Sequence, residues 1–247
     1  MSDTRIATLL RETTRFSRLH HVMSCTSTQD LAASPPLEGD AVFWADHQTR
    51  GRGRQQHEWH DEPGADLAVT FRVTVALPRP LALPAALPVA VLQAIEPLAG
   101  RPLRLKWPND LFLEGKKLCG VLIDAGAAGR DSYLIGVGVN CNRTRFPRDL
   151  EAIATSLAIA TGHLVDRGDL LVAIAQRLEA LLRDLVADRL AELEGVFRDR
   201  LGLLGQRVEI DAGAPHTGTL RALDFAGVTL DDERVFPLAL VRGMRRA

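Results

Sequence analysis

Four candidate strands follow one another closely in the middle of the chain, and their spacing is the feature that most restricts the fold. Short runs rich in Leu, Val and Ile alternate with Pro-Asn-Asp, Glu-Gly and Gly-rich turns. The runs cover residues 103–107, 111–113, 117–124 and 133–140. The second and third are closely spaced around Glu114 and Gly115, a pattern typical of a hairpin. The sheet that they form is therefore at least partly antiparallel.

Helices and further strands are expected on both sides of this region. Strand patterns lie at residues 18–25, 41–45 and 67–76, and helical patterns at 1–20, 26–34, 84–98 and 168–200, the last broken near Asp188 or Gly195. A polar, Gly/Arg-rich loop at 46–65 is unusually long, and such loops are uncommon without a function. The pattern predicts helices together with a sheet that is at least partly antiparallel.

The texture of the sequence changes after Gly202. Very short strand patterns separated by Gly and Asp turns occupy residues 206–210, 217–224, 227–230 and 235–238. Some 45 residues of this kind are typical of a small β-barrel rather than of another α/β layer. We therefore expect a larger domain at 1–203 and a small C-terminal β-barrel domain at 204–247.

Composition narrows the compartment and the class of partner. The 31 acidic and 30 basic residues nearly cancel, so no global field favours DNA or an anionic membrane. The apolar run at 81–95 is interrupted by prolines and falls short of the ~20 residues that a membrane helix needs. Cys25, Cys119 and Cys141 are too few and too scattered for a disulfide framework or a zinc site. We expect buried thiols and a reducing cytoplasm.

The lysines are distributed unevenly. Only three of the 30 basic residues are Lys, and these are Lys106, Lys116 and Lys117. The asparagines, Asn109, Asn140 and Asn142, lie in or just beyond the same stretch. A chain that otherwise uses Arg keeps a compact ammonium here, and the two cations are not interchangeable at a reacting centre. The stretch is therefore a candidate site.

The first candidate segment lies in the long loop. Gly51 and Gly53 let the backbone bend and approach a ligand, and Arg52 and Arg54 offer forks of donors suited to phosphate or carboxylate. Such a loop can equally be a solvated flexible segment or a patch that contacts RNA.

The second segment runs from Lys106 to Asp110 and continues at Lys117. A hairpin would bring Lys117 back near the Lys106 strand, so that two ammonium groups and one carboxylate converge. This set could bind a small carboxylic acid beside a nucleotide phosphate, with Asp110 available for a metal or a proton. The alternative is a surface turn with ordinary salt bridges.

The third segment is an apolar strand with two glycines, Gly136 and Gly138, that ends at Asn140. It can be a kinked core strand or a wall against a flat ligand. A dinucleotide fingerprint, a Walker-type loop and a Gly-x-Ser-x-Gly elbow do not occur in the sequence.

Taken in order, these segments resemble the biotin–protein ligase family over about residues 20–245. The matching strings are Ser27-Thr28-Gln29, Gln48 with Gly51 to Arg54, Trp59, Lys106 to Asp110, Lys117 to Gly120, and Gly136 to Asn140. The resemblance implies an α+β fold: a catalytic domain at 1–203, with a mixed β-sheet flanked by helices as in class II aminoacyl-tRNA synthetases, followed by a small β-barrel at 204–247. Regulatory members carry an N-terminal winged helix; this chain starts too late for one and resembles the ligase-only group, without a DNA-binding role.

The resemblance implies a two-step reaction with biotin, ATP and Mg²⁺. The biotin carboxylate attacks the α-phosphorus to give biotinyl-5'-AMP and pyrophosphate. A lysine of a biotin carboxyl carrier protein, a subunit of acetyl-CoA carboxylase, then takes the biotinyl group. The first step joins two anions, so it needs cations to offset their repulsion.

Family position also implies roles for individual residues. Biotin would be bound by Ser27, Thr28, Gln29, Gln48, Arg52, Gly53, Arg54, Lys117 and Gly120. The nucleotide would be bound by Arg52, Arg54, Trp59 near adenine, Lys106 on the phosphate, Asn109 and Asn140. Catalysis would depend on Lys106, Lys117, Arg52 and Asp110, and Asp110 would contact the metal or accept the proton of the incoming amine.

The chain departs from the family pattern at two places. Residues 55–58 stand where a glycine and another arginine usually follow, and Gln29 stands where Asn usually follows Ser-Thr. Two other functions remain open: a lipoate– or octanoyl–protein ligase on the same fold, and a non-enzymatic RNA-binding module. An edge strand would also permit a homodimer.

Overall fold

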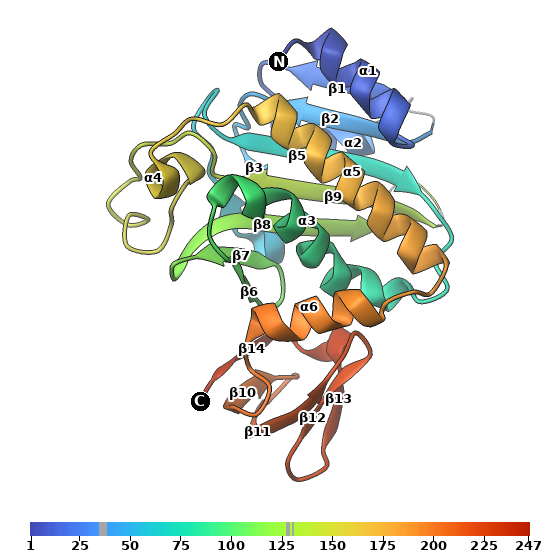
Figure 1. Cartoon of the computed structure of the whole chain (residues 1–247), viewed down its shortest axis with the longest axis vertical. Helices are drawn as coiled ribbons and strands as arrows, with labels where there is room; N and C mark the ends of the chain where they lie inside the picture. The colour runs from blue at the N-terminus through green and yellow to red at the C-terminus, as the bar shows by residue number, and fades with distance from the viewer. Residues whose placement is uncertain (35–38, 127–128, 130) are drawn as a thin grey trace.

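A seven-stranded mixed sheet forms the centre of the computed structural model, which describes residues 1–34, 39–126, 129 and 131–247 (Figure 1). Its strand order is β1-β2-β5-β9-β8-β7-β6. Only β1 and β2 pair in parallel, and every other pair is antiparallel, as the hairpin spacing predicts. The strands are β1 (Arg18–Val22), β2 (Ala41–Ala45), β5 (Leu67–Thr74), β6 (Arg104–Lys106), β7 (Asp110–Leu113), β8 (Lys116–Ala125) and β9 (Ser132–Val139).

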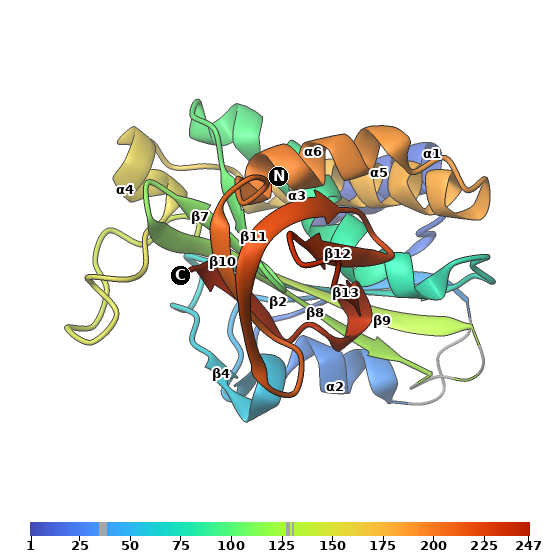
Figure 2. The same cartoon turned by 90° about the horizontal axis from the view of Figure 1, so that it is seen from below.

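Helices cover the two faces of this sheet unequally. Seen from below, α1, α3, α5 and α6 lie on one side, whereas α2 and the segment with β4 lie on the other (Figure 2). The helices are α1 (Asp3–Thr13), α2 (Thr28–Ala33), α3 (Leu83–Ala99), α4 (Leu157–Thr161), α5 (Arg167–Val186) and α6 (Ala191–Leu201). The side with α1, α3, α5 and α6 holds most of the apolar core, so the side with α2 leaves space for a site.

Helix α3 is the core helix. With the 3-10 turn at Pro80–Ala82 it runs over 20 residues, longer than the sequence indicates, and Pro88 and Pro97 lie inside it without ending it. Within the described residues it is the one helix long and apolar enough to cross a membrane. It is, however, largely buried against the sheet and α5, which is how an apolar core helix is used.

The long helical pattern breaks where one of the two predicted positions lies. Asp188 has a φ of 55°, a left-handed conformation that ends α5, while Gly195 lies inside α6. The sequence analysis missed α4, which is a single short turn capped by Ser156.

The C-terminal unit is an antiparallel sheet of five strands in the order β13-β12-β11-β10-β14. Its strands are β10 (Arg207–Asp211), β11 (Pro215–Leu223), β12 (Gly227–Leu230), β13 (Val235–Pro237) and β14 (Gly243–Arg246). The small β-unit is as predicted, but it is open: among the described pairings, β13 and β14 are not joined. The reason is that β13 is only three residues long and the chain then turns through the 3-10 helix at Leu238–Leu240. Strand β14 was not predicted.

Aromatic side chains join the two sheets. The ring of Phe197 packs edge-on against Trp107 at 5.9 Å and against Phe225 at 5.5 Å between centroids. Trp107 Nε1 also donates a hydrogen bond of 2.7 Å to the carbonyl of Val241. The hydrophobic core is therefore continuous across both units, and the boundary between 203 and 204 stays a prediction.

Candidate active site

The register of three neighbouring strands produces a hollow on the face that carries α2. Ala68 of β5 lies opposite Gly138 of β9, which lies opposite Gly120 of β8. Three consecutive positions across the sheet thus carry almost no side chain. Gly136, two residues from Gly138, lies on the same face because side chains alternate along a strand. The glycines of the third sequence segment form the floor of the site.

A small hairpin from the long loop lies over this floor. It consists of β3 (Gly51–Arg52), a 3-10 turn (Arg54–Gln56) and β4 (Glu58–Trp59); the side chain of Gln56 lies outside the described part. A Cβ on Gly51 would lie 2.4 Å from the carbonyl oxygen of Trp59, and one on Gly53 2.9 Å from that of His57. We expected these glycines to admit a ligand; the structure shows that the hairpin itself requires them.

Trp59 packs directly on the floor. A Cβ added to Gly138 would lie 2.5 Å from the indole ring, so only glycine fits beneath it. The Lys117 ammonium lies 5.8 Å from the centroid of the indole. Trp59 is therefore a wall of the cavity beside Lys117, and its expected stacking near adenine stays a prediction.

The hairpin, α2 and the floor enclose a cavity of ≈ 230 Å³. It brings together most of the residues singled out from the sequence. They are Ser27, Thr28, Gln29, Gln48, Arg52, Gly53, Arg54, Trp59, Asn109, Asp110, Lys117 and Gly120. Segments from residue 27 to residue 120 thus meet in one place.

Two of the predicted site residues do not line this cavity. The Lys106 ammonium lies 5.0 Å from the centroid of the Phe112 ring on the exposed edge of the sheet. The expected convergence of two lysines therefore brings in Lys117 alone. Asn140 is buried and donates from Nδ2 to the carbonyl of Thr155 at 2.9 Å, which joins the end of β9 to the following loop. Their roles toward the nucleotide stay predictions.

A buried polar cluster lies over β5. Ser27 caps α2 by accepting a hydrogen bond from the amide of Gln29, as the hydroxyl-rich helix start predicts. Gln48 Oε1 accepts hydrogen bonds from both the amide and the hydroxyl of Thr28, at 2.8 and 3.1 Å, and the hydroxyl of Thr70 donates to that of Thr28. The carboxylate of Asp61 in turn accepts a hydrogen bond from the backbone N–H of Gln48. Thr70 and Asp61 were not singled out from the sequence.

An ion pair lies over β8, on the other side of β9. Lys117 Nζ is 2.7 Å from Asp110 Oδ1. This contact is charged but poorly oriented as a hydrogen bond, so Asp110 Oδ1 keeps capacity to accept one. Gly120 stands opposite Asp110 in the register, and a Cβ there would lie 3.4 Å from both charged atoms. The hairpin predicted around Glu114 is what brings Lys117 to Asp110.

Arg54 and Arg242 add positive charge to the same cavity, which Arg52 also lines. Burial lowers the pKa of Arg54 from its usual value, and the carboxylate of Asp110 partly opposes this. Arg242 reaches the cavity from the segment just before β14. Arg242 was not predicted, since nothing in a lone arginine 125 residues beyond Lys117 indicates that the C-terminal sheet folds back on the site.

The described residues hold no group of three His, Cys, Asp or Glu side chains arranged to bind a metal. Asp110 lies in the cavity beside Lys117, and Glu58 is the other described carboxylate that lines it. Magnesium bound to a nucleotide commonly takes only one or two protein carboxylates, with phosphates and waters as its other ligands. Asp110 fits that use. Burial raises the pKa of the Cys119 and Cys141 thiols, which fits inert apolar packing.

Comparison with known proteins gives a consistent set of relatives. A sequence model of the Biotin/lipoate A/B protein ligase family matches residues 19–142. The chain is 37% identical over 173 residues to the Bacillus subtilis protein named Bifunctional ligase/repressor BirA, covering 67% of this chain and 53% of that protein. It spans about half the length of the two Bacillus relatives.

Matches that cover more of the relative point the same way. The chain is 28% identical over 219 residues to a Biotin--[acetyl-CoA-carboxylase] ligase of Paracoccus denitrificans, covering 83% of this chain and 89% of that one. A Mycobacterium tuberculosis protein of the same name is 31% identical, with 79% and 74% covered. The solved biotin protein ligase from Aquifex aeolicus in complex with biotin and ATP superimposes with a TM-score of 0.81 at 27% identity, covering 94% of this chain and 100% of that one.

Proposed function

The chain belongs to the Biotin/lipoate A/B protein ligase family, and we propose that it works as an ATP-dependent biotin–protein ligase. The observation that carries this is the layout of the cavity: a buried hydrogen-bonding cluster around Thr28 and Gln48 over β5, and the Lys117–Asp110 pair over β8. A ligand with a polar ring at one end and a carboxylate at the other matches both.

The cationic side of the cavity suits the first step. The biotin carboxylate would lie against Lys117, with Arg54 and Arg52 beside it. A carboxylate oxygen attacks the α-phosphorus of ATP, the bond from that phosphorus to the bridging oxygen breaks, and pyrophosphate leaves. Cations fixed in a cavity cost little reorganisation as negative charge gathers, which is why they lower the barrier. Mg²⁺ held by the phosphates and Asp110 would neutralise further charge.

In the second step the lysine amine of a biotin carboxyl carrier protein attacks the acyl carbon of biotinyl-5'-AMP. The new amide bond forms, and AMP leaves with the electrons of the acyl–oxygen bond. Asp110 is the carboxylate positioned to accept the proton of the incoming ammonium group, because it lies beside Lys117 and keeps hydrogen-bonding capacity at Oδ1. A cytoplasmic location and a homodimer stay expectations.

The buried polar cluster favours biotin over lipoate. A lipoyl ring offers no hydrogen-bonding group, so binding it would leave buried polar atoms unpaired, and sites built for hydrogen bonds reject such analogues strongly. Gln48 Oε1 already accepts from Thr28, and in the part of the chain that the structure describes nothing accepts from its Nε2. The ureido ring of biotin would satisfy those donors. Arg52 is paired with Asp30 and Asp124, and Arg54 lines the cavity, which disfavours an open RNA-binding patch.

The experiment that tests the function follows pyrophosphate. The protein is incubated with ATP and Mg²⁺ together with either biotin or lipoate. Release with biotin and not with lipoate is the result that this function predicts. Release with lipoate alone would select the lipoate ligase instead, and no release with either acid would contradict both.

A further inference from the structure

We propose that Asp30 and Asp124 form a carboxylate clasp that holds Arg52, and with it the hairpin 51–59, shut over the cavity. Arg52 Nη1 lies 3.1 Å from Asp30 Oδ1, and Nη2 lies 3.0 Å from Asp124 Oδ2. Asp30 belongs to α2 and Asp124 to β8, so one guanidinium joins two walls of the site. Neither acid carries a role in the function proposed above.

The clasp fastens the hairpin at a second point. Trp59, on β4, is already wedged against Gly138 of the floor. Arg52, on the paired strand β3, reaches the other way to α2 and the end of β8. A hairpin held on both of its strands stays closed, whereas a hairpin held by the Trp59 indole alone can swing open about that contact. The clasp therefore decides how tightly the hairpin covers the cavity.

The strength of the clasp suits a reversible closure. The side chains of Arg52, Asp30 and Asp124 are 42%, 53% and 28% exposed, so water and salt screen their attraction. A guanidinium shared by two carboxylates is nevertheless held more firmly than by one, because its planar fork bonds both at once. We expect the loss of both acids to raise the fraction of molecules with an open hairpin several-fold. Added salt should raise the same fraction by a smaller factor.

Gln29 connects the clasp to the cavity. Its Nε2 donates to Asp124 Oδ2 at 3.2 Å, while its Oε1 is buried without a hydrogen-bond partner among the described residues. That oxygen faces the floor, 3.2 Å from the place where a Cβ of Gly136 would stand. A ligand N–H bonded to Oε1 would fix the Gln29 amide in the orientation that donates to Asp124. Occupancy of the cavity would thereby tighten the clasp.

Limited trypsin digestion tests the clasp without any reference to enzyme activity, because Arg52 and Arg54 are cleavage sites within the hairpin 51–59 and Arg50 is one directly before it. The double variant D30N/D124N keeps the shape of both side chains and removes their charge. We expect its cleavage at these sites to be about 3–10-fold faster than in the wild type, the size of effect of one or two weak ion pairs. Added salt should speed wild-type cleavage and leave the double variant unchanged.

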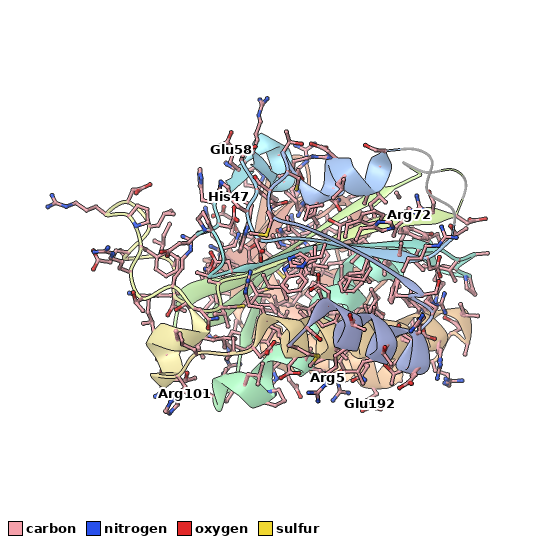
Figure 3. The ribbon with its side chains drawn as sticks, turned by 90° about the horizontal axis from the view of Figure 1, so that it is seen from above. Arg5, His47, Glu58, Arg72, Arg101 and Glu192 are labelled. Carbon is pink, nitrogen blue, oxygen red and sulfur yellow. The ribbon has the colours of Figure 1, made fainter. Side chains whose placement is uncertain are left out.

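Glu192→Gln is the matched control, because it removes one exposed carboxylate on the helical side of the sheet, away from Glu58 of the hairpin (Figure 3). Its digestion should match that of the wild type, and equal melting temperatures should show that all variants are folded. Unchanged cleavage in D30N/D124N would overturn the clasp.

The clasp should also retain biotinyl-5'-AMP in the cavity. This role rests on the proposed function and has its own readout. Biotinyl-5'-AMP formed in a single turnover should leave D30N/D124N about 3–10-fold faster than the wild type, and biotin should slow cleavage of the hairpin in the wild type but not in the variant. If the wild type releases no pyrophosphate, the proposed function fails while the digestion still decides the clasp. If cleavage rises but the release of the intermediate does not, the clasp stands and its retention role is wrong.

Discussion

Lys117 Nζ and Asp110 Oδ1 lie 2.7 Å apart across the β7–β8 hairpin, with Gly120 beside them both. The ammonium is thus held in place before any ligand arrives. A carboxylate that enters the cavity competes with Asp110 for this cation, and the displaced aspartate becomes available as an acceptor. One contact can therefore serve both the activation of an acid and the later arrival of an amine.

Lys117→Arg should lose most of the first step. The charge is retained, but a planar fork cannot occupy the place of a compact ammonium packed so close to Gly120 that a Cβ added there would lie 3.4 Å from it. We expect pyrophosphate release with biotin to fall by about 10²-fold or more, as for the removal of one positioned donor. Lys116→Arg is the control: Lys116 donates to the carbonyl of Glu151 on the surface and should tolerate the change. Near-wild-type release by Lys117→Arg would refute the role of Lys117.

Thr28→Val should weaken the binding of biotin. The change keeps the shape of the side chain but removes the hydroxyl that donates to Gln48 and accepts from Thr70. Leaving those buried groups unpaired costs roughly 1–3 kcal/mol, which is about 5–150-fold in affinity. Calorimetric titration with biotin measures it, and the affinity for ATP should change far less. An unchanged biotin affinity would mean that this cluster does not touch the ligand.

Arg242→Ala should weaken the binding of ATP in particular. Arg242 is the one residue of the C-terminal unit, in the described part of the chain, that lines the cavity, and a cation there suits a phosphate. The KM for ATP should rise about 3–10-fold while that for biotin stays within about twofold, as for loss of a partly exposed charge pair. Arg221→Ala, an exposed arginine of β11 in the same sheet, should change neither value. Equal effects of Arg242→Ala and Arg221→Ala on the KM for ATP would contradict a role of Arg242 in ATP binding.

Glu179→Gln should destabilise the protein in a way that depends on pH. Burial raises the pKa of Glu179, but hydrogen bonds from Arg15 and Arg183 outweigh it, so the pKa lies below the usual 4.5. The folded state therefore holds the proton less tightly than the unfolded state, and the carboxylate stabilises the fold above pH 4.5 and loses this as the pH falls.

We expect the melting temperature of Glu179→Gln at pH 7 to be lower than that of the wild type by about 2–6 °C, for a loss of roughly 1–2 kcal/mol. The gap should narrow as the pH drops through the region below 4.5. A gap that stays constant with pH would show that the charge of Glu179 is not what matters.

Local patterns were enough to predict most of the fold, and the reason is visible in particular elements. The hairpin around Glu114, the cap at Ser27 and the break at Asp188 each depend on neighbours in sequence, so the residues next to them are enough to predict them. Strand β14 and the short α4 carry a weak signal, since four to five residues give little periodicity. Closure of the C-terminal sheet depends on long-range pairing, and the barrel that we expected is an open sheet.

The site was predictable to the extent that motif residues share a cavity. The sequence could not show that Lys106 lies over Phe112 or that Asn140 bonds to Thr155, because the direction of a side chain depends on the partner that it finds. It also could not show that Ala68 joins two glycines in one row. That row exists only through the register of three strands.

The central claim is that this chain attaches biotin to a carrier protein. The most direct measurement is the mass of a biotin carboxyl carrier domain after incubation with the protein, biotin, ATP and Mg²⁺. We expect a gain equal to one biotinyl group on a single lysine, with no gain when ATP is left out, when lipoate replaces biotin, or when Lys117→Arg replaces the wild type. A carrier that stays unmodified with biotin, or that gains a lipoyl group instead, would contradict it.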